Sequence, residues 1–201
     1  EIVPSAQMSR FTLTGTEATF YAVRLARAFT GKPKIVKFEG HFHGYNEPLQ
    51  YNYWPPGAEA YPNLRVESGG TLEVLRDYVI VLPFNDPELL ERTLREQHQE
   101  IAAVILEPLN YNSGTIEPLE GYLALLRRLT AEHGVVLIFD EILSGFRTGT
   151  DCIQGYYRVT PDLCTLGKAL GGGTPLSAIC GKREIMERLS PLGAAMHSGT
   201  Y

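Results

Sequence analysis

Short runs of apolar residues recur along the chain, and polar or glycine-rich residues follow most of them. A run without polar alternation is typical of a strand buried on both faces of a parallel sheet. The clearest is Val135–Phe139, which follows Gly134 and precedes two acidic residues. The pattern predicts strands at 34–38, 79–82, 101–106, 135–139, 163–166 and 176–180.

Apolar residues at helical spacing lie between these runs. From Ala18 to Phe29 they recur every three or four positions, as expected for a helix with one buried face. Thr14 and Glu17 have the spacing of a capping box at its start, and Gly31 marks its end. Further helices are predicted at 86–97, 119–129 and 182–189.

The alternation of strands and helices predicts an α/β fold, with a mostly parallel sheet sandwiched between helices. Residues 45–70 interrupt this order, because they are rich in Pro, Gly, Tyr and Asn and show no period. A connection of this length in a compact domain is usually functional. We expect either a lid over a pocket or a surface excursion that packs against a partner.

Composition limits the possible functions. The 201 residues suffice for one sizeable domain or two small ones. A net charge of −5 without a Lys/Arg block disfavours nucleic-acid binding, and no apolar run is long enough to span a membrane. The chain has three cysteines, an odd number that does not suit a disulfide framework, and their spacing is not that of a metal site. We therefore expect reduced thiols in a cytoplasmic protein and no metal site.

The two ends of the chain suggest a fragment. No Met precedes Glu1, and residues 1–10 resemble the tail of an earlier element. The chain stops at Tyr201, within a polar segment. We therefore expect a longer protein cut at both ends.

Asp140 and Lys168 are the leading candidates for chemistry. Each follows a predicted strand, and ligands of parallel sheets bind at the carboxyl ends of the strands. A lysine in a pocket can form a Schiff base with an aldehyde, and an aspartate can keep a pyridine nitrogen protonated. The pair therefore suggests a pyridoxal 5′-phosphate (PLP) site. A structural salt bridge is the alternative, and the pair alone would favour it.

Two further segments add polar and aromatic groups. Thr14, Gly15 and Thr16 lie at a predicted helix N-terminus, which suits a phosphate but is also compatible with a plain helix cap. Phe42 could stack on a flat ring or be a core residue. The two histidines flanking it, in a His-x-His arrangement, are weak indicators of metal binding and could be loop residues.

Together these parts resemble the class III aminotransferases, PLP-dependent enzymes of fold type I, and most closely the glutamate-1-semialdehyde 2,1-aminomutase group. The resemblance covers nearly the whole chain. The matching segments are GTEATFYAVRLARAFTGKPKIVKFEGHFHG, AAVILEP, LIFDEILSGFR, QGYYRVTPDLCTLGKALGGGTPLSAICGKREIM and HSGTY.

The resemblance implies a role for each site residue. Lys168 would form the Schiff base with the cofactor and carry a proton between substrate carbons, and Asp140 would pair with the pyridine nitrogen. The other residues would contact different parts of the cofactor: its phosphate (Thr14, Gly15, Thr16), its ring face (Phe42) and its ring hydroxyl (Asn112). Gly199 and Thr200 would contact the phosphate bound by the neighbouring subunit, which implies a homodimer with shared active sites.

The sequence also departs from the family pattern. Leu13 stands where the phosphate loop of the family commonly has Asn, and Phe42 stands where Tyr is frequent. By the same resemblance, residues 1–201 would be the PLP-binding large domain, without the N-terminal segment and the C-terminal small domain.

Three functions remain open on the sequence. The first is PLP-dependent amino-group transfer of the aminomutase type on a small amino acid, which a lid at 45–70 would favour. The second is a class III aminotransferase acting on a β- or ω-amino acid, to which the segment HSGTY is also similar. The third is a non-catalytic dimerising homologue or isolated domain. Dinucleotide binding is disfavoured, because Gly171–Gly173 follow the lysine and form no G-x-G-x-x-G motif.

Overall fold

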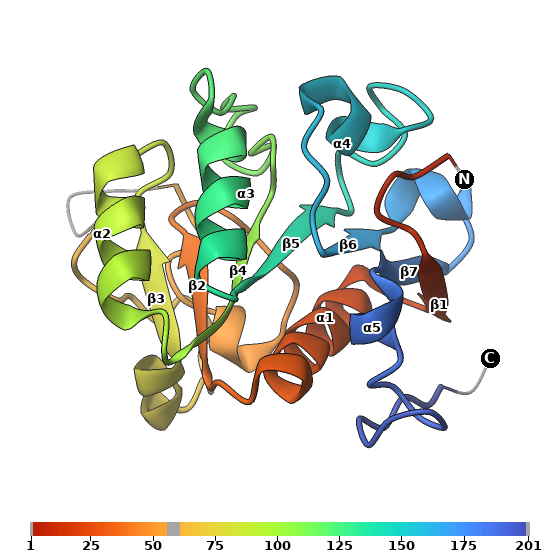
Figure 1. Cartoon of the computed structure of the whole chain (residues 1–201), viewed down its shortest axis with the longest axis horizontal. Coiled ribbons are helices and arrows are strands. Elements are labelled where there is room, and N and C mark those ends of the chain that lie inside the picture. Colours follow the sequence, from red (N-terminus) through yellow and green to blue (C-terminus); the bar gives the residue numbers. More distant parts are fainter. Residues whose placement is uncertain (1, 56–60, 200–201) are drawn as a thin grey trace.

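The computed structural model describes residues 2–55 and 61–199. A seven-stranded sheet in the order β1-β7-β6-β5-β4-β2-β3 forms its centre (Figure 1). The helices and strands in chain order are β1 (Met8–Thr12), α1 (Gly15–Thr30), β2 (Lys34–Phe38), β3 (Val79–Leu82), α2 (Pro87–Gln97), β4 (Ile101–Leu106), α3 (Tyr122–Glu132), β5 (Val136–Glu141), α4 (Cys152–Tyr157), β6 (Leu163–Leu166), β7 (Ser177–Gly181) and α5 (Arg183–Met186).

The predicted α/β class and the mostly parallel sheet are confirmed. Strands β2 to β6 are all parallel to their neighbours among these five strands. Several boundaries differ from the sequence-based expectation. β5 continues through Glu141, so Asp140 lies inside the strand. α3 covers Tyr122–Glu132 where 119–129 was predicted, and α5 is shorter than the predicted helix at 182–189.

The amino-terminal edge of the sheet was not predicted. Residues 8–12 form β1, which pairs antiparallel with β7, and β7 is also antiparallel to β6. The segment MSRFT is neither a continuous apolar run nor a strict alternation of apolar and polar residues, so it lacks a clear strand pattern. Helix α4 was not predicted either, because it is short and contains a glycine, which disfavours helices.

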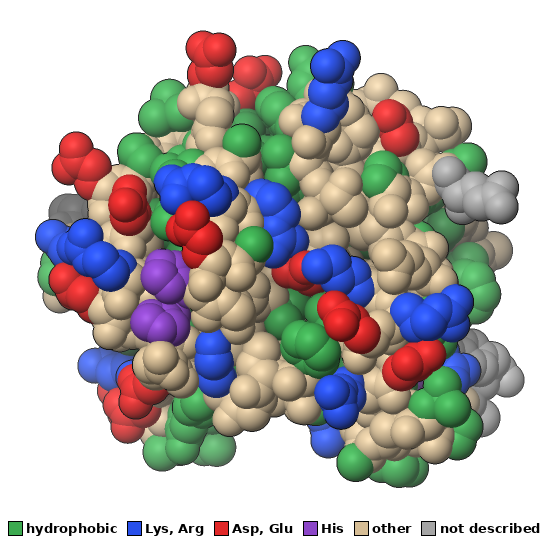
Figure 2. All heavy atoms as spheres, in the orientation of Figure 1, with side chains coloured by type: hydrophobic (Ala, Val, Ile, Leu, Met, Phe, Trp, Pro, Cys, Tyr) green, Lys and Arg blue, Asp and Glu red, His purple; other side chains and the backbone are tan. Residues whose placement is uncertain are grey.

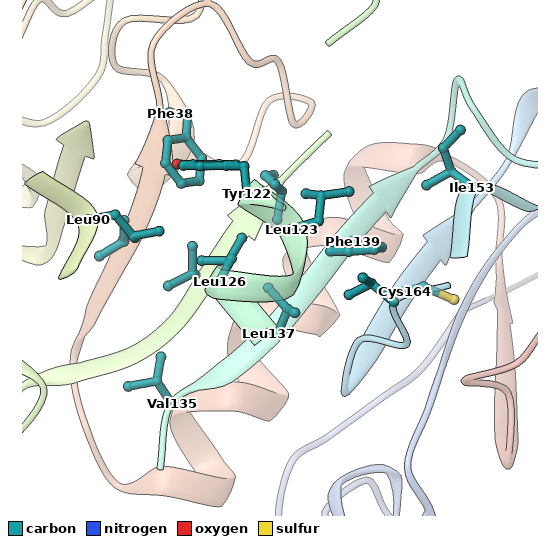
Figure 3. Packing of buried hydrophobic residues seen from close by; sticks show 14 of the residues in the cluster. Phe38, Leu90, Tyr122, Leu123, Leu126, Val135, Leu137, Phe139, Ile153 and Cys164 are labelled. Carbon is teal, nitrogen blue, oxygen red and sulfur yellow. The ribbon is translucent and has the colours of Figure 1, made fainter. Parts of the chain in front are cut away.

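Helices cover both faces of the sheet. Helices α2, α3 and α4 pack on one face, where Leu90, Leu126 and Ile153 belong to the same buried cluster as Phe139 and Leu137 of β5 (Figure 3). Helices α1 and α5 cover the other face. Because β4 and β5 are buried on both faces, their sequences are continuous apolar runs.

Helix α1 begins and ends as the sequence predicts. Thr14 is its N-cap, and the capping box with Glu17 is formed by both partners. Gly31 ends the helix with φ +72°, a conformation that glycine adopts at little cost.

Residues 45–70 are held against the protein by buried contacts. Tyr51 is fully buried and its carbonyl accepts a hydrogen bond of 2.5 Å from the Lys37 ammonium group, which is also fully buried. The side chain of Asn52 binds the backbone of Asn63 and Arg65. The described part of this segment is therefore a packed excursion.

The surface view in Figure 2 shows blue and red side chains interspersed over the helices α2 and α3. No basic patch of the kind that tracks a phosphate backbone is visible on this face. Among the described residues, no helix has both the length and the hydropathy needed to cross a bilayer.

Candidate functional site

A cavity of about 270 Å³ lies at the carboxyl ends of the central strands. Strand β5 brings Asp140, the turn after β6 brings Lys168, and the start of α1 brings Gly15 to the same cavity. Seven of the nine residues predicted from the sequence line it: Thr14, Gly15, Thr16, Phe42, Asn112, Asp140 and Lys168.

Asp140 is the most extensively bound side chain of the cavity. It is 4% exposed. Its Oδ2 lies 2.7 Å from Nδ1 of His43, and its Oδ1 accepts hydrogen bonds from the Thr165 hydroxyl at 2.9 Å and the Ile142 N–H at 3.2 Å. Three donors fix the carboxylate in position and leave it at the cavity wall, which suits the binding of a cationic N–H group.

The histidines beside Phe42 lie in the loop after β2, as expected, and both are buried. Burial lowers the pKa of His43, although Asp140 opposes this effect. A neutral His43 donates its Nδ1–H to Asp140, which leaves Nε2 as an acceptor without a partner in the described part of the chain. His41 accepts the N–H of Glu107 at 3.0 Å. Sequence reasoning missed the His43–Asp140 pair, because 97 positions separate the two residues.

The hydrogen bond from Thr165 to Asp140 joins two strands of the site. Replacing Thr165 by valine keeps the shape of the side chain and leaves Oδ1 of Asp140 with one donor fewer. We expect the free energy of unfolding to fall by about 1.5–3 kcal/mol, as for other hydrogen bonds to charged groups. Urea denaturation of Thr165→Val beside Thr165→Ser, which retains the hydroxyl, measures this. Equal stability of the two variants would contradict the role assigned to the hydroxyl.

Glu107 is a second buried carboxyl group in the cavity wall. Its Oε1 accepts hydrogen bonds from the Phe42 N–H at 2.9 Å and from the Asn112 amide at 2.7 Å. Its Oε2 is buried and has no partner among the described residues. Burial raises the pKa of Glu107 to about 7. Asn112 therefore points to Glu107, a residue that the sequence analysis did not single out.

The raised pKa of Glu107 makes a pH dependence measurable. The carboxyl group of Glu107 keeps its proton up to about pH 7 in the folded state, but only up to about pH 4.5 in the unfolded state. Proton binding by Glu107 therefore stabilises the folded state fully below pH 4.5, and this contribution is lost as the pH rises to 7. We expect Glu107→Gln, which keeps the acceptor Oε1, to remove this loss, on the order of 1–3 kcal/mol between pH 4.5 and 7. Denaturation of the cofactor-free protein at several pH values measures it. Parallel pH profiles for parent and variant would contradict the raised pKa.

The start of α1 presents free backbone N–H groups to the cavity. The N–H groups of Leu13 and Thr14 donate to the Glu17 carboxylate, whereas those of Gly15 and Thr16 have no acceptor among the described residues. Gly44 packs against this turn with φ +75°, and a Cβ there would lie 2.5 Å from the Thr16 hydroxyl oxygen. The glycine therefore lets the chain approach closely, and the unpaired N–H groups at the helix end suit an anion.

Lys168 follows Gly167 at the end of β6 and starts a 3₁₀ turn through Gly171. Its φ is +43°, a left-handed conformation that is uncommon for a residue with a Cβ. Such backbone conformations concentrate at functional sites. Phe42 lines the same cavity and contacts the rings of Tyr45 and Tyr53 at its edges.

No described residue of 45–70 lines the cavity. The structure therefore gives no support to a lid formed by the described residues of this segment, and packing against a partner stays a prediction.

The structure does not place Gly199 in this cavity, and Thr200 lies outside the described residues. Gly199 lines a separate surface depression with His197 and Ser198. The Tyr21 hydroxyl of α1 holds this segment, donating to the Ser198 carbonyl at 3.1 Å and lying 3.4 Å from the Ser198 N–H.

Metal binding finds no support in residues 2–55 and 61–199, where no three His, Cys, Asp or Glu side chains are grouped closely enough to hold an ion.

Comparison with known proteins shows the family. The family model described as "Aminotransferase class-III" matches residues 1–201. The chain belongs to the class III aminotransferase family. A glutamate-1-semialdehyde 2,1-aminomutase of Methanocaldococcus jannaschii is 46% identical over 199 residues, which is 99% of this chain and 46% of that protein. This class III chain thus spans about half the length of the curated relatives it matches.

Solved structures agree with this assignment. An omega-transaminase from Sphaerobacter thermophilus is 40% identical with a TM-score of 0.91, over 98% of this chain and 46% of that one. A transaminase with PLP bound is 31% identical with a TM-score of 0.89, over 100% of this chain and 47% of that one. The predicted fold type is therefore confirmed for this class III chain.

Proposed function

We propose that the protein containing this chain is a PLP-dependent enzyme that moves an amino group of a small amino acid, as glutamate-1-semialdehyde 2,1-aminomutase does. The observation that supports it most is the single cavity that contains Lys168, Asp140 and the free N–H groups of α1. Residues 1–201 would form its PLP-binding large domain.

The residues of the cavity fit this cofactor. Its phosphate matches the unpaired N–H groups of Gly15 and Thr16, with the hydroxyls of Thr14 and Thr16 beside them. Its pyridine nitrogen matches the buried carboxylate of Asp140. Phe42 offers a ring face, and Asn112, held by Glu107, offers a polar contact. When bound, PLP acts as an electron sink for the carbon that loses a proton.

The protein's own residues would supply position and proton transfer. Lys168 would hold the cofactor aldehyde through Nζ, and its free amine would take a proton from one substrate carbon and return it to another. Asp140 would keep a proton on the pyridine nitrogen, and His43 and Thr165 hold the carboxylate in place.

A class III aminotransferase acting on a β- or ω-amino acid is the second candidate. An aminomutase must retain the aminated intermediate, and a lid over the cavity would help retention. Because no described residue of 45–70 lines the cavity, the structure does not supply that argument for the aminomutase. The similarity to an omega-transaminase also favours the second candidate.

Turnover of glutamate-1-semialdehyde by the PLP-loaded full-length protein, with no keto acid added, distinguishes the candidates. Isomerisation without an acceptor supports the aminomutase. Turnover only after a keto acid is added supports the aminotransferase. Stable PLP binding without turnover of any amine would support the third possibility, a non-catalytic dimerising homologue.

We also propose a homodimer with shared active sites and a cytoplasmic location. Gly199 lies outside the cavity of its own chain, so any contact that it makes with a cofactor would be in a second copy. The three cysteines are free thiols, which is compatible with a reducing compartment.

A further inference from the structure

Two of the three cysteines face each other across neighbouring strands. Cys164 of β6 and Cys180 of β7 are directly opposite in the antiparallel register. Opposite residues of an antiparallel pair have their side chains on the same face and their Cα atoms about 4.5–5.5 Å apart. A disulfide needs Cα atoms about 4.4–6.8 Å apart, so the backbone already has a suitable separation.

The two thiols are in contact inside the protein. Cys164 is fully buried and Cys180 is 4% exposed, and both belong to the core cluster that contains Phe139 and Ile153. Figure 3 shows Cys164 on β6 beside Phe139. The hydroxyl of Ser5 donates to the Cys164 sulfur at 3.2 Å. The proximity of the two thiols lowers the pKa of Cys180 to about 7 and, together with burial, raises the pKa of Cys164.

We propose that Cys164 and Cys180 are a redox modification site, a dithiol that a low-molecular-weight disulfide oxidises to a cross-strand disulfide. The Cys180 thiolate attacks one sulfur of the oxidant, releases a thiolate and forms a mixed disulfide. The Cys164 thiol then loses its proton, attacks the Cys180 sulfur and releases the second thiolate. Two protein thiols become one disulfide, and the oxidant is reduced to two thiols.

The disulfide would span a segment of the chain that contains cavity residues. The segment 165–179 between the two cysteines includes Lys168 and the cavity residues Thr174 to Leu176. A bond between Cys164 and Cys180 closes this segment into a loop and ties together the strands at both of its ends. The reduced strands are already paired, so the bond constrains the unfolded chain without rearranging the folded one.

Access comes from the sheet edge. β1 is the edge strand and pairs only with β7, and its exposed residue Ser9 is opposite Cys180. Local opening of an edge strand exposes the residue beneath it far more readily than global unfolding does. Cys180 is therefore the thiol that meets the oxidant first.

Mass spectrometry of trypsin digests tests the proposal, because the three cysteines fall in three separate tryptic peptides, 148–158, 159–168 and 169–182. The full-length PLP-loaded protein is incubated with oxidised glutathione, remaining thiols are alkylated, and the protein is denatured and digested. We expect peptides 159–168 and 169–182 to appear joined, two hydrogens lighter than their sum, while 148–158 contains alkylated Cys152. A link from Cys152 to Cys180, or no link at all, would overturn the proposal.

Thermal denaturation provides the second readout. Oxidation should raise the Tm by about 5–10 °C, and dithiothreitol should reverse the shift. The matched control Cys152→Ser should show the same shift, whereas Cys164→Ser and Cys180→Ser should show none. An equal shift of Tm in all four proteins would assign the stabilisation to another cause. If a variant folds poorly, the peptide mapping of the parent protein still tests the disulfide.

Discussion

Replacing Lys168 by alanine should reduce turnover by at least about 10²–10⁴-fold, the usual contribution of a positioned acid–base group. The loss should exceed that range if the covalent link to the cofactor is also required. Lys168 is exposed and lies in a turn, so the free energy of unfolding should change by no more than about 0.5 kcal/mol. Activity and stability are thereby separated in one variant.

The covalent link can be located directly. The full-length PLP-loaded protein is reduced with borohydride and digested with trypsin, which does not cleave after a modified lysine. We expect the cofactor mass on one peptide spanning 159–182, with no cleavage after Lys168. Lys168→Arg retains the charge and should show no cofactor adduct, whereas the control Lys182→Ala should retain the adduct. An adduct on any other lysine would remove Lys168 from its proposed role.

Replacing Asp140 by asparagine should have the second largest effect, with turnover falling by about 10²-fold or more. Its Oδ1 now faces two donors, the Thr165 hydroxyl and the Ile142 N–H, and its Oδ2 faces the Nδ1–H of His43. An amide can accept with one atom only, so in either orientation its NH₂ group faces a donor. The variant thus loses both the charge and a hydrogen bond at the position proposed for the pyridine nitrogen.

Asp162 offers a matched control for Asp140. It is also a buried aspartate beside a sheet strand, but it lies at the opposite end of β6, where it pairs with Lys182 at 2.7 Å and Arg127 at 3.0 Å. Asp162→Asn should lower stability without changing the visible absorbance of bound PLP, and Asp140→Asn should change that spectrum. If Asp140→Asn keeps the parent spectrum and near-normal turnover, Asp140 does not pair with the cofactor.

Much of the fold and the site was predictable because it depends on local pattern. Continuous apolar runs at β4 and β5 reflect burial on both faces, and the chain direction of a parallel strand determines where its carboxyl end lies. Asp140, Lys168 and the cap of α1 could therefore be assigned to one edge before their contacts were known. The family resemblance then gave each residue an expected role.

Pairing across the sheet could not be read from that pattern. Periodicity indicates which side chains are buried, but it does not indicate which residue of a neighbouring strand lies opposite a given residue. The bond of His43 to Asp140, the support from Thr165 and the contact of Cys164 with Cys180 all depend on strand order and register. The edge strand β1 follows the same rule, since it is a strand only because β7 supplies its hydrogen bonds.

The sequence by itself determined the α/β class, the main strands and the residues that meet at their carboxyl ends, because burial and helix capping are properties of short segments. Only the tertiary structure decided that His43 supports Asp140, that Glu107 holds Asn112, that the described part of residues 45–70 packs away from the cavity, and that two cysteines face each other. The physical reason is that these contacts join segments far apart in the chain, and their partners are chosen by the geometry of the assembled sheet.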